Sequence, residues 1–511
     1  MFNSATFLLL FLPVALVLYH GLFAGRDRWR QPFLIGLTIL FYAIGGKIFV
    51  GLLLLSVVVN YGVARWISAC RHMARSTRWP LVLGIGFDLT LLFYFKYFAA
   101  VIGGADALFG LNAALPKIAL PLGISFFTFQ QIGFLVDLAR GRFEMKSALD
   151  YAGFVLFFPQ LLAGPIVRYE ELVPQLRARP PRAASNDILV GLTIFAIGLF
   201  KKAVIADTVA TLASPVFDAA AAGTVPGTAA CWIAAFAYTA QIYFDFSGYS
   251  DMAIGTARMF GIVLPLNFHS PLRATSIIEL WRRWHITLSR WAQSYIFQPL
   301  TIPLARFAAD HAPGKRGTFL LSFAVPIMLS MVVIGVWHGA GWTFVLFGVL
   351  QGLYMVVNEA WRMAHRKARK ARKGHLPAYV EPMYQALTLI AFVIAVVAFR
   401  APSLGTVGRM YLAMIGGGTG SAVTAWPGGI AGALAILAVV YAVVYLAPNT
   451  QAIMARYEPV LDWAKWRKVD PARLAVEWRL NAGWVVASAL LLLAGFALMM
   501  RGTTNFIYFN F

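Results

Sequence analysis

The chain has 511 residues, of which 60% are apolar or aromatic and only 13% are charged. About one-quarter of the residues of an average soluble protein are charged, so this composition excludes an ordinary soluble globule and indicates a membrane protein. The net charge of +22 gathers in short segments between apolar runs. Because cytoplasmic loops of membrane proteins collect Lys and Arg in this way, we expect contacts with membrane lipids and no nucleic-acid partner.

Apolar runs long enough to cross a bilayer, which takes roughly 20 residues, recur from one end of the chain to the other. The clearest are 5–23, 80–101, 188–206, 318–337, 384–399, 427–447 and 482–500, and runs interrupted by Gly or Pro cover 33–59, 118–139 and 342–357. They predict an all-α, polytopic protein of about ten to eleven transmembrane helices, with re-entrant or interfacial segments around a central tunnel. We expect one membrane-embedded domain over 1–511.

The charges in the loops predict the direction in which the helices cross. The basic segment 362–373 is expected on the cytoplasmic side, and Lys315 places the start of run 318–337 on the same side. His338 follows that run, so we expect it toward the outer half of the membrane.

The segment 245–300 is too polar for a lipid-facing span. It begins with Asp245, Ser247 and Asp251 in apolar surroundings, and the helical pattern over 276–297 also carries several charges. Charged side chains at membrane depth face protein or a wet cavity, which predicts re-entrant or interfacial segments here. The two aspartates could orient a histidine, bind a cation or tie helices together, and the residues alone slightly favour the last role.

Two of the eight histidines are candidates for chemistry. His338 lies in a long apolar context, where an imidazole must be paired or face a cavity; a site is favoured over a structural hydrogen bond. His285 shares the predicted helix with Trp281 and Trp284, and an interfacial helix explains that pattern equally well. Histidine suits removal of a proton from a hydroxyl near neutral pH. Motifs for another nucleophile or for a metal are missing from the sequence, so we expect no metal site.

Several segments of the chain, in order, carry a family resemblance. They include PLGISFFTFQQIGFLVD at 121–137, FFPQLLAGPIVRYEELVPQL at 157–176, AYTAQIYFDFSGYSDMAIG at 237–255, ELWRRWHITLSRW at 279–291, GVWHGAGWTFVLFGVLQG at 335–352 and the terminal FIYFNF. The sequence resembles the membrane-bound O-acyltransferase family, and within it the bacterial branch that O-acetylates secreted polysaccharides such as alginate. The chain departs from the branch pattern after Trp291, where a GGNR-like turn is replaced by GKRG at 314–317.

The resemblance implies acyl transfer in a membrane-embedded tunnel. His338 matches the residue regarded as catalytic and His285 the second active-site histidine. For the tunnel and substrate contacts we predict a further set of residues, namely Trp281, Trp284, Trp337, Asp245, Ser247 and Asp251. The oxyanion of the reaction is expected to be supported by His285, by a Trp indole or by an Asn or Gln amide.

The same resemblance implies the reaction's partners. The expected donor is acetyl-CoA, taken from the cytoplasm as a substrate, with no bound cofactor. The expected acceptor is a hydroxyl on a secreted polysaccharide or on a periplasmic acetyltransferase that delivers the group, which places the protein in the bacterial inner membrane. Two alternatives stay open: transfer of another acyl group, such as D-alanyl to teichoic acid, and a non-catalytic transporter, which predicts inverted repeats that the sequence does not display.

Overall fold

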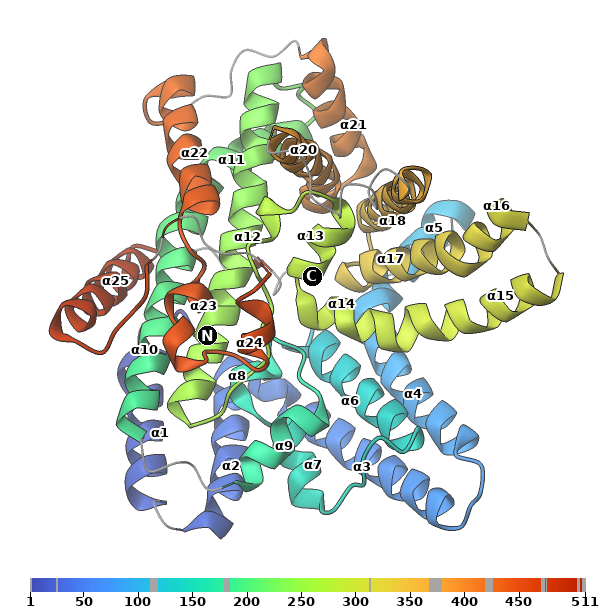
Figure 1. Ribbon diagram of the computed structural model, residues 1–511, viewed down its shortest axis with the longest axis vertical. Helices are drawn as coiled ribbons and strands as arrows, with labels where there is room; N and C mark the ends of the chain where they lie inside the picture. Colours follow the sequence, from blue (N-terminus) through green and yellow to red (C-terminus); the bar gives the residue numbers. More distant parts are fainter. Residues whose placement is uncertain are drawn as a thin grey trace.

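The computed structural model describes residues 2–23, 26–110, 118–178, 184–311, 314–366, 379–418, 426–469, 474, 476–502 and 506–507. Within these ranges the regular structure is helical, and a single β-bridge joins Pro265 to Leu461. The all-α prediction is therefore confirmed (Figure 1).

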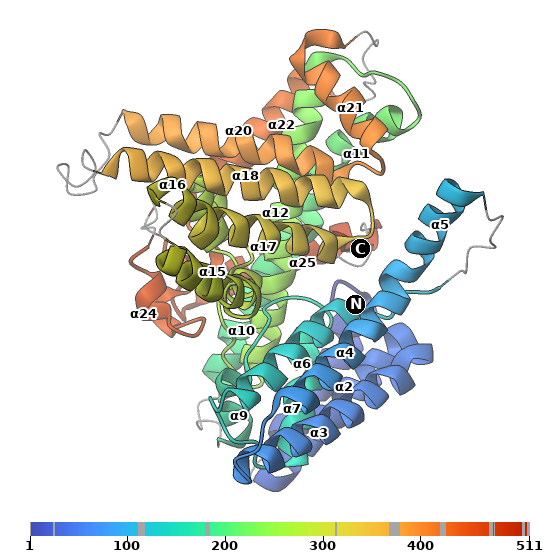
Figure 2. The same ribbon diagram turned by 90° about the vertical axis from the view of Figure 1, so that its right-hand side faces the viewer.

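The first third of the chain forms a group of helices at one end of the molecule, drawn blue to teal (Figure 2). Its elements are η1 (Phe7–Phe11), α1 (Leu12–Val17), η2 (Leu18–Leu22), α2 (Asp27–Gly46), η3 (Lys47–Phe49), α3 (Val50–His72), α4 (Arg78–Leu92), η4 (Phe93–Tyr97), α5 (Phe98–Phe109), α6 (Ile124–Ala139), α7 (Ala148–Val155), α8 (Phe158–Leu161) and α9 (Tyr169–Arg177). Helix α6 packs against α3 and α4 and is buried along most of its length.

The middle of the chain provides the central helices and the segment with the first candidate histidine. Its elements are α10 (Ala184–Phe200), η5 (Lys201–Ala206), α11 (Asp207–Ala221), α12 (Thr228–Met259), η6 (Pro271–Arg273), α13 (Ile277–Arg283), α14 (Ile286–Ala292), η7 (Gln293–Phe297) and α15 (Gln298–His311). The prediction of re-entrant or interfacial structure throughout 245–300 is wrong at its start, because Asp245 and Asp251 lie inside the continuous 32-residue helix α12.

The last third of the chain packs against the central helices α10 and α12. Its elements are α16 (Gly314–Phe319), η8 (Leu320–Ala324), α17 (Val325–His338), α18 (Trp342–Ala364), α20 (Val380–Arg400), α21 (Leu404–Leu412), η9 (Ala413–Gly417), α22 (Gly429–Leu446), α23 (Thr450–Ile453), η10 (Ala455–Tyr457), α24 (Trp463–Trp466) and α25 (Ala482–Met500). Helices α17, α18 and α20 lie side by side (Figure 2). Most of the basic segment 362–373 and the last four residues of FIYFNF lie outside the described residues.

Eight helical stretches among the described residues are long and apolar enough to cross a membrane. Helices α2 and α3 belong to one of these stretches, Arg28–His72, and the apolar helices Phe7–Leu22 and Ile124–Ala139 are shorter than the others. Helix α12 has the length of a span but carries Asp245 and Asp251. The chain is a multi-pass membrane protein, as the composition predicts.

Two glycine pairs bring α10 and α12 together in the centre of the molecule (Figure 1). A Cβ atom added to Gly191 would lie 2.5 Å from the carbonyl oxygen of Gly255, and one added to Gly198 would lie 2.6 Å from the carbonyl oxygen of Gly248. Small residues allow membrane helices to approach this closely. Because α12 leads into the segment that carries His285, the glycine contacts help to place the candidate site.

Ion pairs join α12 to η5, the turn of helix that follows α10. The Nζ atom of Lys202 lies 2.7 Å from Asp245 Oδ1, and that of Lys201 lies 2.7 Å from Asp251 Oδ2. The backbone N–H of Ile507, near the chain's end, donates to Asp245 Oδ2 at 3.0 Å. The two aspartates are therefore neutralised by lysines inside the protein, as charges at membrane depth require.

The glycine contacts generate a stability prediction. We expect Gly198→Ala to lower the free energy of unfolding by about 1–3 kcal/mol, because the new methyl group would overlap the backbone of α12. Gly62→Ala, on α3, is the matched control, since an added Cβ there meets nothing within 4 Å and alanine favours a helix. The measurement is the unfolding midpoint of both purified variants in detergent; an equal midpoint for Gly198→Ala and wild type would contradict the close packing.

Candidate active site

His338 is the last residue of α17 and lies at the end of a 25-residue helical stretch, Gly314–His338. At 1.5 Å per residue this stretch is roughly 36 Å long, which separates the imidazole from Lys315 by about the thickness of a bilayer core. The side chain is buried against the rings of Trp337 and Phe399, whose centroids lie 4.7 and 4.9 Å from its own.

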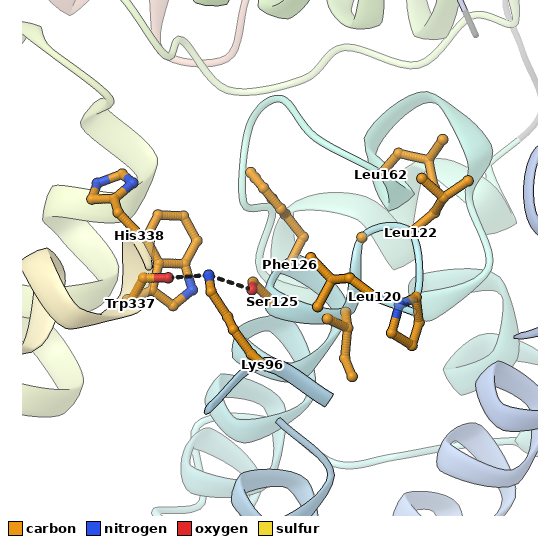
Figure 3. Close-up of a pocket in the computed structure, with 11 residues that line it drawn as sticks. Lys96, Leu120, Leu122, Ser125, Phe126, Leu162, Trp337 and His338 are labelled. Atoms are coloured by element: carbon orange, nitrogen blue, oxygen red, sulfur yellow. Dashed lines mark hydrogen bonds between the residues drawn. The ribbon is translucent and has the colours of Figure 1, made fainter. Parts of the chain in front are cut away.

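A pocket forms beside His338, where α17 meets the N-terminal helices (Figure 3). Residues 120–126 form one wall, and Lys96, Leu162, Trp337 and His338 complete the lining. We name it the histidine pocket. Lys96 donates hydrogen bonds to the backbone oxygen of Trp337 and, at 3.4 Å, to Ser125 Oγ. The pocket therefore places a histidine and a lysine on one cavity wall.

His285 lies at a break between α13 and α14. The prediction of a continuous helix over 276–297 is wrong here, because Trp284 is extended and His285 has a left-handed backbone with φ of 41°. Such a conformation in a residue other than glycine costs free energy and often marks a functional site. The turn carries the imidazole into the protein, where it is fully buried.

A chain of hydrogen bonds fixes the orientation of the His285 ring. The backbone N–H of Ile166 donates to Thr287 Oγ1 at 2.9 Å, so the Thr287 hydroxyl gives its own proton to Asn267 Oδ1 at 2.8 Å. His285 Nδ1 lies 3.0 Å from the same Asn267 oxygen and must donate to it. In the neutral ring this places the proton on Nδ1 and the lone pair on Nε2.

The ring of Trp337 lies close to the rings of both histidines. Its ring centroid lies 6.3 Å from that of His285 and 4.7 Å from that of His338. On its other side it stacks at 5.2 Å on Phe129, which stacks in turn on Trp291 at 3.9 Å with nearly parallel planes. We call Trp337, Phe129 and Trp291 the aromatic stack. The indole N–H of Trp291 donates to the Phe129 backbone oxygen at 2.8 Å, which holds the stack together.

A second pocket lies at the far side of the aromatic stack. It is lined by α6 between residues 129 and 137, by 166–169 and by side chains of α14 and η7. We name it the arginine pocket, because Arg168 and Arg290 line it. Both pockets use α6, so this helix runs from the histidine pocket, past the stack, to the arginine pocket.

The tryptophans predicted to line a tunnel have different surroundings. Trp337 lines the histidine pocket. Trp281 and Trp284 pack α13 instead: the Trp281 indole donates to Gln351 Oε1 at 3.0 Å, and the Trp284 ring lies 5.2 Å from that of Phe392. These two tryptophans hold the His285 turn against α18 and α20.

The predicted tunnel residues on α12 line neither pocket. Asp245, Ser247 and Asp251 are all buried, and Asp251 also accepts hydrogen bonds from Thr450 at 2.6 Å and Gln451 at 2.7 Å. The contacts of the two aspartates join α12 to neighbouring segments. That these three residues contact the substrate or a tunnel stays a prediction.

The site contains residues that the sequence analysis did not single out, notably Lys96, Ser125, Asn267 and Thr287. A lone lysine within an apolar run was a visible signal for Lys96, whereas Asn267 gains its role only from the fold. Among the described residues, His, Cys, Asp and Glu side chains do not gather in threes where they could hold a metal ion.

Comparison with known proteins identifies the family. A model described as "MBOAT, membrane-bound O-acyltransferase family" matches residues 116–399. The probable alginate O-acetylase AlgI of Azotobacter vinelandii is 36% identical over 418 residues, covering 81% of this chain and 77% of that protein. The peptidoglycan O-acetyltransferase of Helicobacter pylori is 37% identical over 395 residues, covering 72% of each. The teichoic acid D-alanyltransferase of Streptococcus thermophilus is 28% identical over 258 residues, covering 49% of this chain and 60% of that protein.

The chain belongs to the membrane-bound O-acyltransferase family. It is an integral membrane enzyme, an O-acyltransferase, and the transporter alternative is set aside. The matched range contains both histidines, both pockets' α6 walls and the aromatic stack.

The hydrogen-bond chain around His285 generates a prediction for activity. Asn267→Leu keeps the size of the side chain but removes the oxygen that fixes the ring, so we expect acyl transfer to fall by about 10²-fold or more, as when a catalytic histidine loses its orienting acceptor. Ser250→Ala is the control, because it removes only the partner of the Asn267 amide nitrogen. In a double variant with His285→Ala, the loss should not exceed that of His285→Ala alone; additive losses would contradict the coupling.

Proposed function

We propose that this enzyme transfers an acetyl group from a thioester donor to a hydroxyl, with His338 as the general base. The observation that carries the proposal is that the rings of His338 and His285 both lie close to the ring of Trp337, which lines a pocket together with His338. Two imidazoles buried among aromatic rings have no part in surface chemistry. They suit a reaction from which water is excluded.

The reaction needs one proton acceptor and one place for negative charge. The acceptor hydroxyl enters the histidine pocket and gives its proton to His338 as its oxygen forms a bond with the thioester carbonyl carbon. The electron pair of the C=O bond moves onto the carbonyl oxygen. When the C=O bond reforms, the C–S bond breaks and the leaving thiolate takes the proton from His338. Holding both reactants in one cavity supplies much of the rate.

His285 serves this reaction as a hydrogen-bond acceptor. Its Nδ1 proton is directed to Asn267, so a neutral His285 offers the lone pair of Nε2. Because the attacking hydroxyl gives its single proton to His338, we propose that this lone pair accepts a hydrogen bond from a second hydroxyl of the acceptor and so orients the acceptor beside His338. Support of the oxyanion then falls to another group.

The donor enters through the arginine pocket. Arg168 and Arg290 line this pocket, and Arg290 is paired with Glu171. Arg140 and Arg142 lie close to the pocket, bonded to Ser294 and Asp137. Guanidinium groups attract phosphates, which suits acetyl-CoA, taken up as a substrate and not as a bound cofactor. Its acyl arm reaches His338 only when the aromatic stack parts, so donor binding and opening of the stack are coupled.

The relatives support the proposed acceptor and the proposed location. Proteins named for alginate and peptidoglycan O-acetylation are 36% and 37% identical to this chain, which supports a hydroxyl on a secreted polysaccharide as the final acceptor. The group passes to the polymer directly or through a periplasmic acetyltransferase partner. For both routes we propose that the enzyme lies in the bacterial inner membrane.

D-alanyl transfer to teichoic acid is the second candidate. The relative with that name covers 49% of this chain, against 81% for the alginate relative, and therefore supports it less. An assay in which the purified enzyme is given either labelled acetyl-CoA or a D-alanyl carrier protein separates the two candidates. We expect the enzyme to consume acetyl-CoA and to leave the D-alanyl carrier protein unchanged.

The general-base role predicts the effect of removing His338. We expect His338→Ala to insert normally and to lower polymer-bound O-acetyl by about 10²–10⁴-fold, the usual contribution of a general base. His311→Ala, an exposed histidine on α15, is the control and should leave acetylation unchanged. Full acetylation by His338→Ala, at equal protein levels in the membrane, would contradict the general-base role and leave His338 with a structural role only.

A further inference from the structure

Lys96 is a half-buried cation within an apolar helical stretch, Arg78–Asp106. It lies in η4, a widened turn of π-helix between α4 and α5, and such turns often occur at functional sites. Its side chain crosses from the N-terminal helices to the end of α17 and contacts the backbone of Trp337 (Figure 3). The ammonium group therefore lies on the wall of the histidine pocket, beside the proposed general base.

The charge of Lys96 is balanced differently from the charges of Lys201 and Lys202. Lys201 and Lys202 each lie within 2.8 Å of aspartate oxygens, so their charges are balanced by carboxylates of the protein. Among the residues that the structure describes, Lys96 has no carboxylate within 4.0 Å; its hydrogen bonds go to a backbone oxygen and to Ser125, and its Nζ atom lies 5.7 Å from the centroid of the Trp337 ring. A half-buried cation at membrane depth is costly without an anionic partner.

Capping of α17 does not account for this charge. The adjacent residue, Tyr97, donates its neutral hydroxyl to the backbone oxygen of Val336 at 2.9 Å. A neutral donor thus suffices for the carbonyl next to the one that Lys96 contacts. The extra cost of a lysine at this position points to an anion that is present only during the reaction.

We infer that Lys96 is a further catalytic residue, whose ammonium group stabilises the negative charge that forms on the carbonyl oxygen of the donor. This inference rests on the proposed acyl transfer. An ammonium group has three N–H donors; two are directed to Trp337 and Ser125, and the third is available to a substrate oxygen in the pocket. When the hydroxyl attacks, the C=O electron pair becomes an oxyanion next to Lys96, and the charge is lost again as the C–S bond breaks. Such preorganised donors act mainly on the chemical step.

Four variants separate the charge from the hydrogen bond. Lys96→Met removes both, Lys96→Gln keeps an N–H donor without the charge, and Lys96→Arg keeps the charge. Tyr97→Phe is the matched control, because it removes only the neighbouring bond to α17. Membrane vesicles from the native host, which contain the natural acceptor, are given [14C]acetyl-CoA, and the initial rate is measured at increasing donor concentration. Protein levels and unfolding midpoints are compared for all variants.

We expect Lys96→Met and Lys96→Gln to lower the maximal rate by about 10²–10³-fold, as loss of an oxyanion donor does, with little change in the donor KM. Lys96→Arg should recover much of the rate, and Tyr97→Phe should lose less than about tenfold. A Lys96→Gln rate equal to that of Tyr97→Phe would show that Lys96 only caps α17, and a loss confined to KM would make it a binding group; either result overturns the inference.

Failure of the proposed function has a different signature. If wild-type vesicles do not use acetyl-CoA, the donor assignment fails, and the same Lys96 variants are compared by the O-acetyl content of polymer from intact cells, which supply the natural donor. If His338→Ala stays active while Lys96→Gln does not, the general base is misassigned and the oxyanion role of Lys96 stands.

Discussion

The end of α17 is the point on which the active site depends. A helix leaves its last carbonyl groups unpaired, and at membrane depth no water satisfies them. Here the N–H of Gly339 bonds to Val336 at 3.0 Å, and Tyr97 and Lys96 reach across from the N-terminal helices to the last carbonyls. The residues joined in this way are about 240 positions apart in sequence. These contacts hold the end of α17 against the N-terminal helices beside the histidine pocket.

The second histidine depends on another kind of constraint. His285 is held in a left-handed backbone conformation, which costs about 1–3 kcal/mol and persists only where the surroundings enforce it. The backbone of Asn267 accepts from the N–H of Ile286 at 2.9 Å, and its side chain accepts from His285 and Thr287. One asparagine thus fixes both the turn and the tautomer of the ring. Of the aromatic stack, Trp337 lines the histidine pocket, and Phe129 and Trp291 line the arginine pocket; in the proposed function these rings shield the thioester from water.

Much of this arrangement was predictable from composition and from single polar residues in apolar surroundings. Apolar runs predicted the helical class, and an imidazole in the middle of hydrocarbon drew attention to His338. The turn at His285 was not predictable, because a helical period continues through 276–297 and no glycine marks the left-handed residue. The aspartates of α12 were predicted as site residues because their lysine partners lie 43 and 50 positions earlier in the chain. Helical periodicity relates residues within one helix and therefore could not predict these pairs. Asn267 and Lys96 acquire their roles only when distant segments meet.

The central claim is that one buried site joins a donor on one side of the membrane to an acceptor on the other. The most direct test uses the enzyme in sealed proteoliposomes with one orientation, with [14C]acetyl-CoA supplied only on the face that carries the arginine pocket. The hydroxyl acceptor, with its partner proteins where needed, is supplied only on the opposite face. Labelled acetyl should appear on the acceptor across the intact bilayer. Transfer that occurs only when donor and acceptor share the same side would contradict a site that connects the two faces.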